Sequence, residues 1–172
     1  MIRELCSCGQ TGVAQGALAA ARHCGLRTSG WMPEGFMTET GPSPDVAKRF
    51  GLKELTRAGE LRPIRSNVKD SDSTLWIAAP PRIETDPAYW AARKAVATYG
   101  HPFLIIPAKL TEEDAAGLIA QWADRWDVTR LHVAGPRASL WAGAEERAKL
   151  VVMAALHALG TCRPKKKLAV VG

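Results

Sequence analysis

Short apolar runs alternate along the chain with longer segments in which apolar residues recur at helical spacing. The runs STLWIAA (73–79), PFLIIP (102–107) and RLHVAG (130–135) are apolar enough to predict buried strands. A further strand is expected at about residues 2–6, and a short one in LRTSGW (26–31). Strands without a polar face are typical of a parallel sheet that is covered on both sides.

Amphipathic helices follow these strands. The first is expected over about residues 11–24, Asp86-Pro87 caps the second, Thr111 opens the third, and the fourth follows residue 139. Their inner faces are predicted to contain Val13, Ala17, Ala20, Ala21 and Cys24; Tyr89, Ala92, Val96 and Tyr99; Ala115, Leu118, Ile119, Trp122 and Trp126; and Ala148, Val151, Val152, Ala155 and Leu159. The alternation predicts a Rossmann-like three-layer α/β/α sandwich with a mainly parallel sheet, in one domain over residues 1–160.

Two segments fall outside this alternation. About forty residues after the second strand are irregular and rich in Pro and Gly, with short helices expected at 44–50 and 64–69. Residues 161–172 are read as a basic C-terminal tail or, through KLAVVG, as an edge strand.

Charge and cysteine content limit the expected partners and the expected compartment of the protein. The net charge is +6, and part of the excess lies in Arg163 and Lys165–Lys167, without any RNA-recognition or zinc-finger motif, so nucleic acid is not the favoured partner. No apolar run is long enough for a membrane helix, and the first residues lack the apolar core of a signal peptide. The four cysteines form no CxxC pair, so we expect a cytoplasmic protein whose cysteines are reduced and fill apolar space.

The candidate site combines two glycine-containing strand-to-helix turns, SCGQTG (7–12) and AGPRAS (134–139). At the carboxyl edge of a parallel sheet such turns present backbone N–H groups and the positive end of a helix to an anion. We therefore expect a phosphate-bearing ligand or cofactor to be bound by Ser7, Gly9, Gln10, Thr11, Gly12, Gly135, Pro136, Arg137 and Ser139. The alternatives are turns that serve geometry alone, and an Arg137 that forms a structural ion pair with Glu145 or Glu146.

Other candidate residues favour structural roles. Asp70 and Asp72 in NVKDSD are close enough in sequence to suggest magnesium, but Asp and Ser in a turn more commonly bond loop backbone. Trp31 is expected to pack in the core, with ring stacking or a subunit contact as alternatives. His23, His101, His132 and His157 lack ligand spacing, so no metal site is assigned, and no nucleophile–base pair is recognised.

Four motifs together carry a resemblance. SCGQTGV, GWMPEG followed by ETG, NVKDSD followed by TL, and VAGPRAS occur in the order found in the putative molybdenum carrier family, a circularly permuted YpsA-like branch of the SLOG superfamily. The match covers about residues 3 to 160. The resemblance implies a Rossmann-like fold, a glycine-rich pocket for a phosphate-bearing ligand such as a nucleotide or the molybdenum cofactor, and homo-oligomers, dimers or tetramers.

The chain departs from the family pattern in its middle loops. Ala14 and Gln15 replace an Asp-Arg pair, and Glu34, Phe36 and Met37 replace the basic residues of PKGRR. Thr85 and Asp86 replace glycines of a second turn. An acidic helix cap at that turn disfavours an anion, because the carboxylate repels phosphate and occupies the helix N–H groups.

Three function classes follow from these observations. The favoured one is a binding or carrier protein for a phosphate-bearing small molecule. The second is a nucleoside-monophosphate phosphoribohydrolase, although the PGGxGTxxE loop of those enzymes has no match in the chain. The third is a diverged oligomeric scaffold without a small ligand. Six tryptophans in one small domain also suggest that some lie between subunits.

Overall fold

A five-stranded parallel sheet with strand order β2-β1-β9-β7-β8 organises the computed structural model, which describes residues 1–56, 61–79 and 85–162. Its strands are β1 (Glu4–Cys6), β2 (Arg27–Ser29), β7 (Ser73–Ile77), β8 (Phe103–Ile106) and β9 (Arg130–Ala134). The predicted Rossmann-like sandwich is confirmed. Residues 163–172, including the predicted tail or edge strand, lie outside the described residues.

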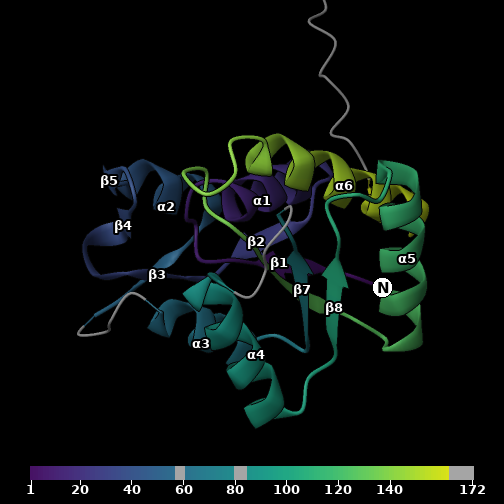
Figure 1. The fold of residues 1–172 in the computed structure, drawn as a ribbon, viewed down its shortest axis with the longest axis horizontal. Helices are drawn as coiled ribbons and strands as arrows, with labels where there is room; N and C mark the ends of the chain where they lie inside the picture. The colour runs from purple at the N-terminus through teal and green to yellow at the C-terminus, as the bar shows by residue number, and fades with distance from the viewer. Residues whose placement is uncertain (57–60, 80–84, 163–172) are drawn as a thin grey trace, which may run out of the picture.

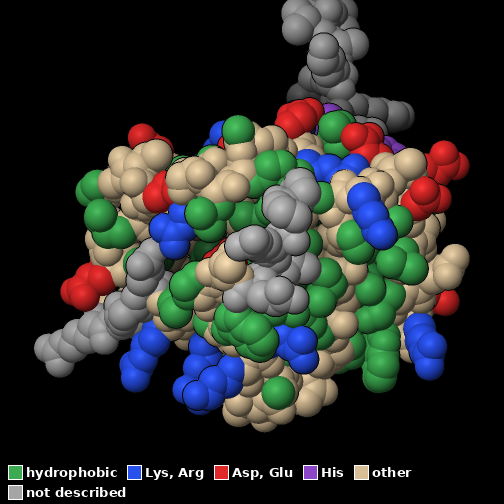
Figure 2. Space-filling model, viewed as in Figure 1, with side chains coloured by type: hydrophobic (Ala, Val, Ile, Leu, Met, Phe, Trp, Pro, Cys, Tyr) green, Lys and Arg blue, Asp and Glu red, His purple; other side chains and the backbone are tan. Residues whose placement is uncertain are grey.

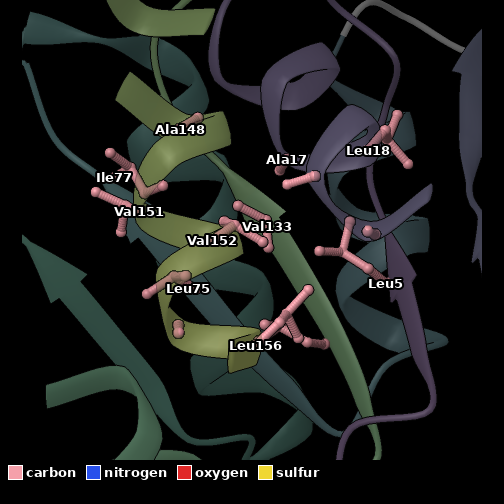
Figure 3. Packing of buried hydrophobic residues seen from close by; sticks show 14 of the residues in the cluster. Leu5, Ala17, Leu18, Leu75, Ile77, Val133, Ala148, Val151, Val152 and Leu156 are labelled. Atoms are coloured by element: carbon pink, nitrogen blue, oxygen red, sulfur yellow. The ribbon is translucent and has the colours of Figure 1, made fainter. Parts of the chain in front are cut away.

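Helices α1 (Val13–His23), α5 (Glu112–Arg125) and α6 (Ala144–Ala158) cover one face of the sheet, above and to the right in Figure 1. Their apolar residues form one cluster with Leu5, Leu75 and Val133 of the strands (Figure 3). The small residues of α1 allow a close approach to α6: a Cβ on Gly16 would lie 2.1 Å from the carbonyl oxygen of Glu145.

The opposite face is covered by α3 (Arg62–Lys69) and α4 (Pro87–Tyr99). Trp76, Tyr89 and Ala134 belong to its apolar cluster, and the Trp76 and Tyr89 rings pack edge to face with centroids 5.3 Å apart. Asp86 caps α4 as predicted, since its side chain accepts a hydrogen bond from the N–H of Ala88. Thr111 likewise caps α5 through the N–H of Asp114.

The segment predicted to be irregular contains more structure than the sequence indicates. It consists of β3 (Trp31–Pro33), the short 3-10 helix η1 (Glu34–Phe36), β4 (Met37–Thr38), β5 (Gly41–Pro42), α2 (Pro44–Phe50) and β6 (Lys53–Leu55). The strands form two small sheets, β3-β6 and β4-β5. The short strand expected within 26–31 is present as β2. It ends before Gly30, whose φ is 144° and which lies against the carbonyl of Ser7, and β3 begins at the next residue.

Two other sequence expectations need correction. The α5 face is rotated: Ala115, Ala116, Ile119 and Ala123 are buried, whereas Leu118 and Trp126 are 42% and 54% exposed. Strand β8 is half-buried instead of buried, because it forms an edge of the sheet.

The expectation of four reduced cysteines is wrong for two of them. Cys24, at the end of α1, forms a disulfide with Cys162, which follows α6, across 138 positions of the sequence. Such a pair cannot be read from spacing, because only the packing of α1 on α6 brings these two chain ends together. Cys6 and Cys8 are free thiols. None of the described helices has the length and apolar content needed to span a bilayer.

Candidate functional site

The two predicted turns lie side by side at the carboxyl edge of the sheet, because β1 and β9 are neighbouring parallel strands. The N–H of Val13, in the first turn of α1, donates to the carbonyl of Pro136, and the N–H of Ala138 donates to the Thr11 hydroxyl. Gly12 has a φ of 77°, and a Cβ there would lie 2.6 Å from the Pro136 oxygen. Gly12 is therefore required by the second turn, whatever it also offers a ligand.

A carboxylate of the chain itself lies at the junction of the two turns. The Thr11 and Ser139 hydroxyls both donate to Glu39, and the backbone N–H of Ser139 donates to the same carboxylate at 3.1 Å. The Nε of Arg137 lies 4.0 Å from Glu39 Oε2. Glu39 thus accepts the donors that the sequence assigned to a bound anion.

Glu39 is held ionised by these contacts. Its partial burial raises the pKa through desolvation, but the hydrogen bonds from Ser139 and Thr11 and the charge of Arg137 outweigh this, so the pKa lies below its usual value. The carboxylate therefore retains its negative charge at neutral pH. Any second anion at the junction would have to displace it or share Arg137 with it.

A small pocket opens beside the turns. Its enclosed volume is about 40 Å³, and the space is about 590 Å³ when the open solvent at its mouth is included. It lies where the ends of β1, β7 and β9 meet the first residues of α3 and α4. Its walls are mainly apolar and include Ala14, Pro33, Leu61, Pro63, Ile64, Trp76, Ala88 and Ala134. The polar groups that the described residues bring to the pocket belong to Cys8, Gln10, Gly135, Arg137 and Asp86. In Figure 2 hydrophobic side chains gather over α4 and α5, with Lys and Arg along the lower margin near α3 and α4.

The structure divides the predicted ligand residues into groups. Gln10, Gly135 and Arg137 line the pocket, while Thr11 and Ser139 face Glu39. Ser7 is buried, and its hydroxyl donates to the carbonyl of Val133 at 2.6 Å, which ties β1 to β9.

The remaining predicted residues contribute backbone. Gly9, with a φ of 68°, packs under Leu52 and Met32, Gly12 packs under Pro136, and the Pro136 carbonyl accepts from α1. These contacts pack the first turn against Met32 and Leu52 and against the second turn.

Sequence reasoning missed Glu39 as a member of the site, although it stands in the quoted ETG motif. The Gln10 side chain accepts from the backbone N–H of Glu39, so the first turn also positions the residue that fills the junction. Cys8, Trp76 and the start of α3 were missed as well. Periodicity marks Trp76 and Ile64 as core residues, and only the sheet topology shows that they line a pocket.

One departure from the family pattern lies in the wall of the pocket. Asp86, where the family has glycine, lines the pocket and caps α4 at the same time. The described part of the pocket wall therefore contains the Asp86 carboxylate as well as the Arg137 guanidinium, and the carboxylate disfavours a ligand group with negative charge beside it.

The motif NVKDSD lies away from the pocket, at the amino end of β7. Asp72 accepts from the N–H groups of Thr129 and Arg130, and Asp70 accepts from the Trp31 indole at 2.7 Å. Asn67 is buried and bonds both backbone polar groups of Trp31, which ties α3 to β3. The structural interpretation of Asp70 and Asp72 is supported by these contacts.

Three further groups have shifted pKa values. Desolvation raises the pKa of the Cys6 thiol to about 12 and raises that of Cys8 against a smaller opposing effect of Arg137. Both thiols are therefore protonated at neutral pH and are poor nucleophiles there. Burial lowers the pKa of His132 to about 3, so this imidazole is neutral. Its Nδ1 lies 3.3 Å from the Thr74 hydroxyl.

Comparisons with known proteins show the family of the chain and a solved structure with the same fold. The profile of the circularly permutated YpsA SLOG family matches residues 5–156. A crystal structure titled "Putative molybdenum carrier protein", from Syntrophus aciditrophicus SB, superposes with a TM-score of 0.82 at 28% sequence identity, covering 90% of this chain and 95% of that chain. No match is found among curated proteins.

Proposed function

We propose, from the premise that the chain belongs to the circularly permutated YpsA SLOG family, that it binds and carries a small molecule in the pocket beside Gly135 and Arg137. The ligand has a flat apolar body and one anionic group, as in a nucleotide or the molybdenum cofactor, a phosphorylated pterin. The observation that carries the proposal is a mainly apolar pocket with a guanidinium in its wall at the carboxyl edge of the sheet, where ligands bind in open α/β folds.

The fit to a phosphate-bearing ligand rests on few groups. Arg137 offers a planar fork for two oxygens, and Gln10 offers an amide beside it. The apolar walls around Trp76 and Ile64 suit a ring system. The relative from Syntrophus is named a molybdenum carrier, which supports a ligand of that class for this chain.

Glu39 and Asp86 limit how the anion binds. The donors of Thr11 and Ser139 are already taken by Glu39, so the phosphate contacts Arg137 from the pocket side. Among the described residues that line the pocket, Arg137 is the one cation, and we expect micromolar rather than nanomolar affinity for phosphate esters.

A ligand-free scaffold is the second candidate function, and Glu39 is the observation that favours it. Because a carboxylate of the chain satisfies both turns, the fold needs no bound anion there. In that case the exposed Trp90 and Trp126, 52% and 54% accessible, serve contacts between copies of the chain. We propose a dimer or tetramer for either function, and a monodisperse monomer in light scattering would contradict it.

Thermal unfolding in the presence of defined probes separates the two functions. The panel consists of inorganic phosphate, molybdate, AMP, GMP and a pterin phosphate. A ligand present at one hundred times its Kd stabilises the folded state by about 2.7 kcal/mol, which raises the melting temperature by several degrees. A rise for a ring-bearing phosphate beyond that for inorganic phosphate supports the pocket. If no probe raises the melting temperature, the ligand-free scaffold is the function that remains supported.

A further inference from the structure

The Cys24–Cys162 disulfide has a third metal-ligating group beside it. His157, in the last turn of α6, places a ring nitrogen within 4.8 Å of both sulfur atoms. Among the described residues this is the one group of three or more His, Cys, Asp or Glu side chains with such spacing. It lies at the end of α1 opposite the candidate pocket, separated by 11 helical residues, or roughly 16 Å.

The backbone holds both cysteines in place without the help of the S–S bond. The N–H of Cys24 donates to Ala20 at the end of α1, and the N–H of Cys162 donates to Leu156 at the end of α6. The two helices pack closely along the apolar face of the sheet. The two sulfur atoms therefore remain neighbours when the disulfide is reduced.

The His157 ring has a nitrogen available as a metal ligand. Its Nδ1 lies 2.8 Å from the carbonyl oxygen of Met153, and because a carbonyl only accepts, Nδ1 carries the proton. Nε2 then keeps its lone pair. Backbone carbonyls commonly fix metal-binding histidines in this tautomer.

We propose that Cys24, Cys162 and His157 form a binding site for a thiophilic divalent cation, such as Zn²⁺, when the two cysteines are reduced. Two thiolates and one imidazole are a ligand set that zinc accepts, with a water in the fourth position. In a tetrahedral site with such bonds the ligand atoms lie about 3.5–3.8 Å apart, which is compatible with the observed spacing. His157 is exposed, so the ion has a path to the site.

The disulfide and the metal complex exclude each other. A thiol reductant transfers two electrons and two protons to the Cys24–Cys162 bond, which gives two thiols while the reductant becomes a disulfide. Binding of the cation then releases one proton from each thiol. In the reverse direction a small-molecule disulfide accepts two electrons from the two thiolates and becomes two thiols, which re-forms the Cys24–Cys162 bond and releases the cation. Both forms connect the end of α1 to the residue that follows α6.

The test uses the full chain, reduced with a phosphine and freed of reductant and metal without oxygen. Titration with Co²⁺ is followed by the sulfur-to-cobalt absorption in the near ultraviolet, and Zn²⁺ affinity by competition with a chromogenic chelator. We expect one equivalent of cation, absorption from two thiolates, and no binding by the oxidised protein.

Two matched variants control for folding and for surface histidines. His157→Gln changes an exposed side chain and leaves both cysteines, and it should weaken Zn²⁺ binding at least about tenfold. His23→Gln changes an exposed histidine in the last turn of α1 and should leave Zn²⁺ affinity unchanged. Cys24→Ser should abolish the two-thiolate absorption. Absence of stoichiometric binding in the reduced protein, or equal affinity in the wild type and His157→Gln, would overturn the proposal.

Discussion

The two faces of the central sheet differ in the side chains that they present to the covering helices. Under α1, α5 and α6 the strands present apolar residues such as Leu5, Leu131 and Val133, and small helix residues fill the space between them. Under α3 and α4 the registered positions Cys6, His132 and Thr74 form a polar row across three strands.

The polar row is incompletely paired. Nε2 of His132 is buried and has no hydrogen-bond partner among the described residues. The candidate pocket opens on this second face, between Trp76, Ala134 and the starts of α3 and α4. Close packing provides stability on the first face, whereas the second gives up packing and provides the space that a ligand needs.

A single added side chain should disrupt the helix packing on the first face. Gly16→Val would place its Cβ 2.1 Å from a backbone carbonyl of α6, so the helices must separate, and we expect a loss of about 3 kcal/mol or more in the free energy of unfolding. Denaturant unfolding measures this.

Gly117→Ala is the matched control for that prediction. Gly117 lies within α5 with no atom within 4 Å of an added Cβ, so alanine should stabilise by about 0.5–1 kcal/mol through helix propensity. Equal effects of the two substitutions would contradict the close approach of α1 to α6.

On the pocket side, Arg137→Ala should weaken binding of any phosphate-bearing ligand found in the thermal panel. We expect a loss of about 1.5–3 kcal/mol in binding free energy, the range for a hydrogen bond to a charged group, with little change in folding. Calorimetry gives the affinity, and Arg22→Ala at the far end of α1 is the control. A large loss of stability with unchanged affinity would instead assign Arg137 to structure.

The polar row should make the protein sensitive to acid. Burial depresses the pKa of His132 from 6.5 to about 3, so the unfolded state takes up a proton that the folded state does not between those values. Above about pH 6.5 the His132 side chain does not lower the free energy of unfolding. Below that pH the free energy of unfolding falls by up to about 1.4 kcal/mol per pH unit, which amounts to roughly 2 kcal/mol by pH 5. His132→Leu should remove this slope in urea unfolding. An unchanged slope would place the sensitivity elsewhere.

The smallest effect is expected at the junction of the turns. Glu39→Gln keeps the shape but removes the charge, so stability at pH 7 should fall by about 1 kcal/mol. The depressed pKa of Glu39 stabilises the fold fully only above the pKa that this carboxyl has in the unfolded chain. The stability difference between wild type and Glu39→Gln should therefore shrink as the pH falls from that pKa towards the lower pKa of the folded protein. The variant should also bind a phosphate ligand more tightly, since Arg137 no longer faces a second anion. Weaker binding would show that Glu39 assists the ligand.

Local pattern determined the sandwich, the helix caps at Asp86 and Thr111, and the helix of residues 44–50, because each depends on a period or on residues near in sequence. The neighbouring turns at residues 7–12 and 134–139 were also predictable, since parallel strands end at one edge of a sheet.

Two contacts were decided by the tertiary structure alone. They are the contact of Glu39 with the two turns and the Cys24–Cys162 disulfide at the far end of α1. Glu39 reaches Ser139 across 100 positions, and Cys24 reaches Cys162 across 138. No periodicity links residues so far apart. Their contact depends on which helices pack together and on where the short strands between β2 and α3 run, and these are properties of the packed chain.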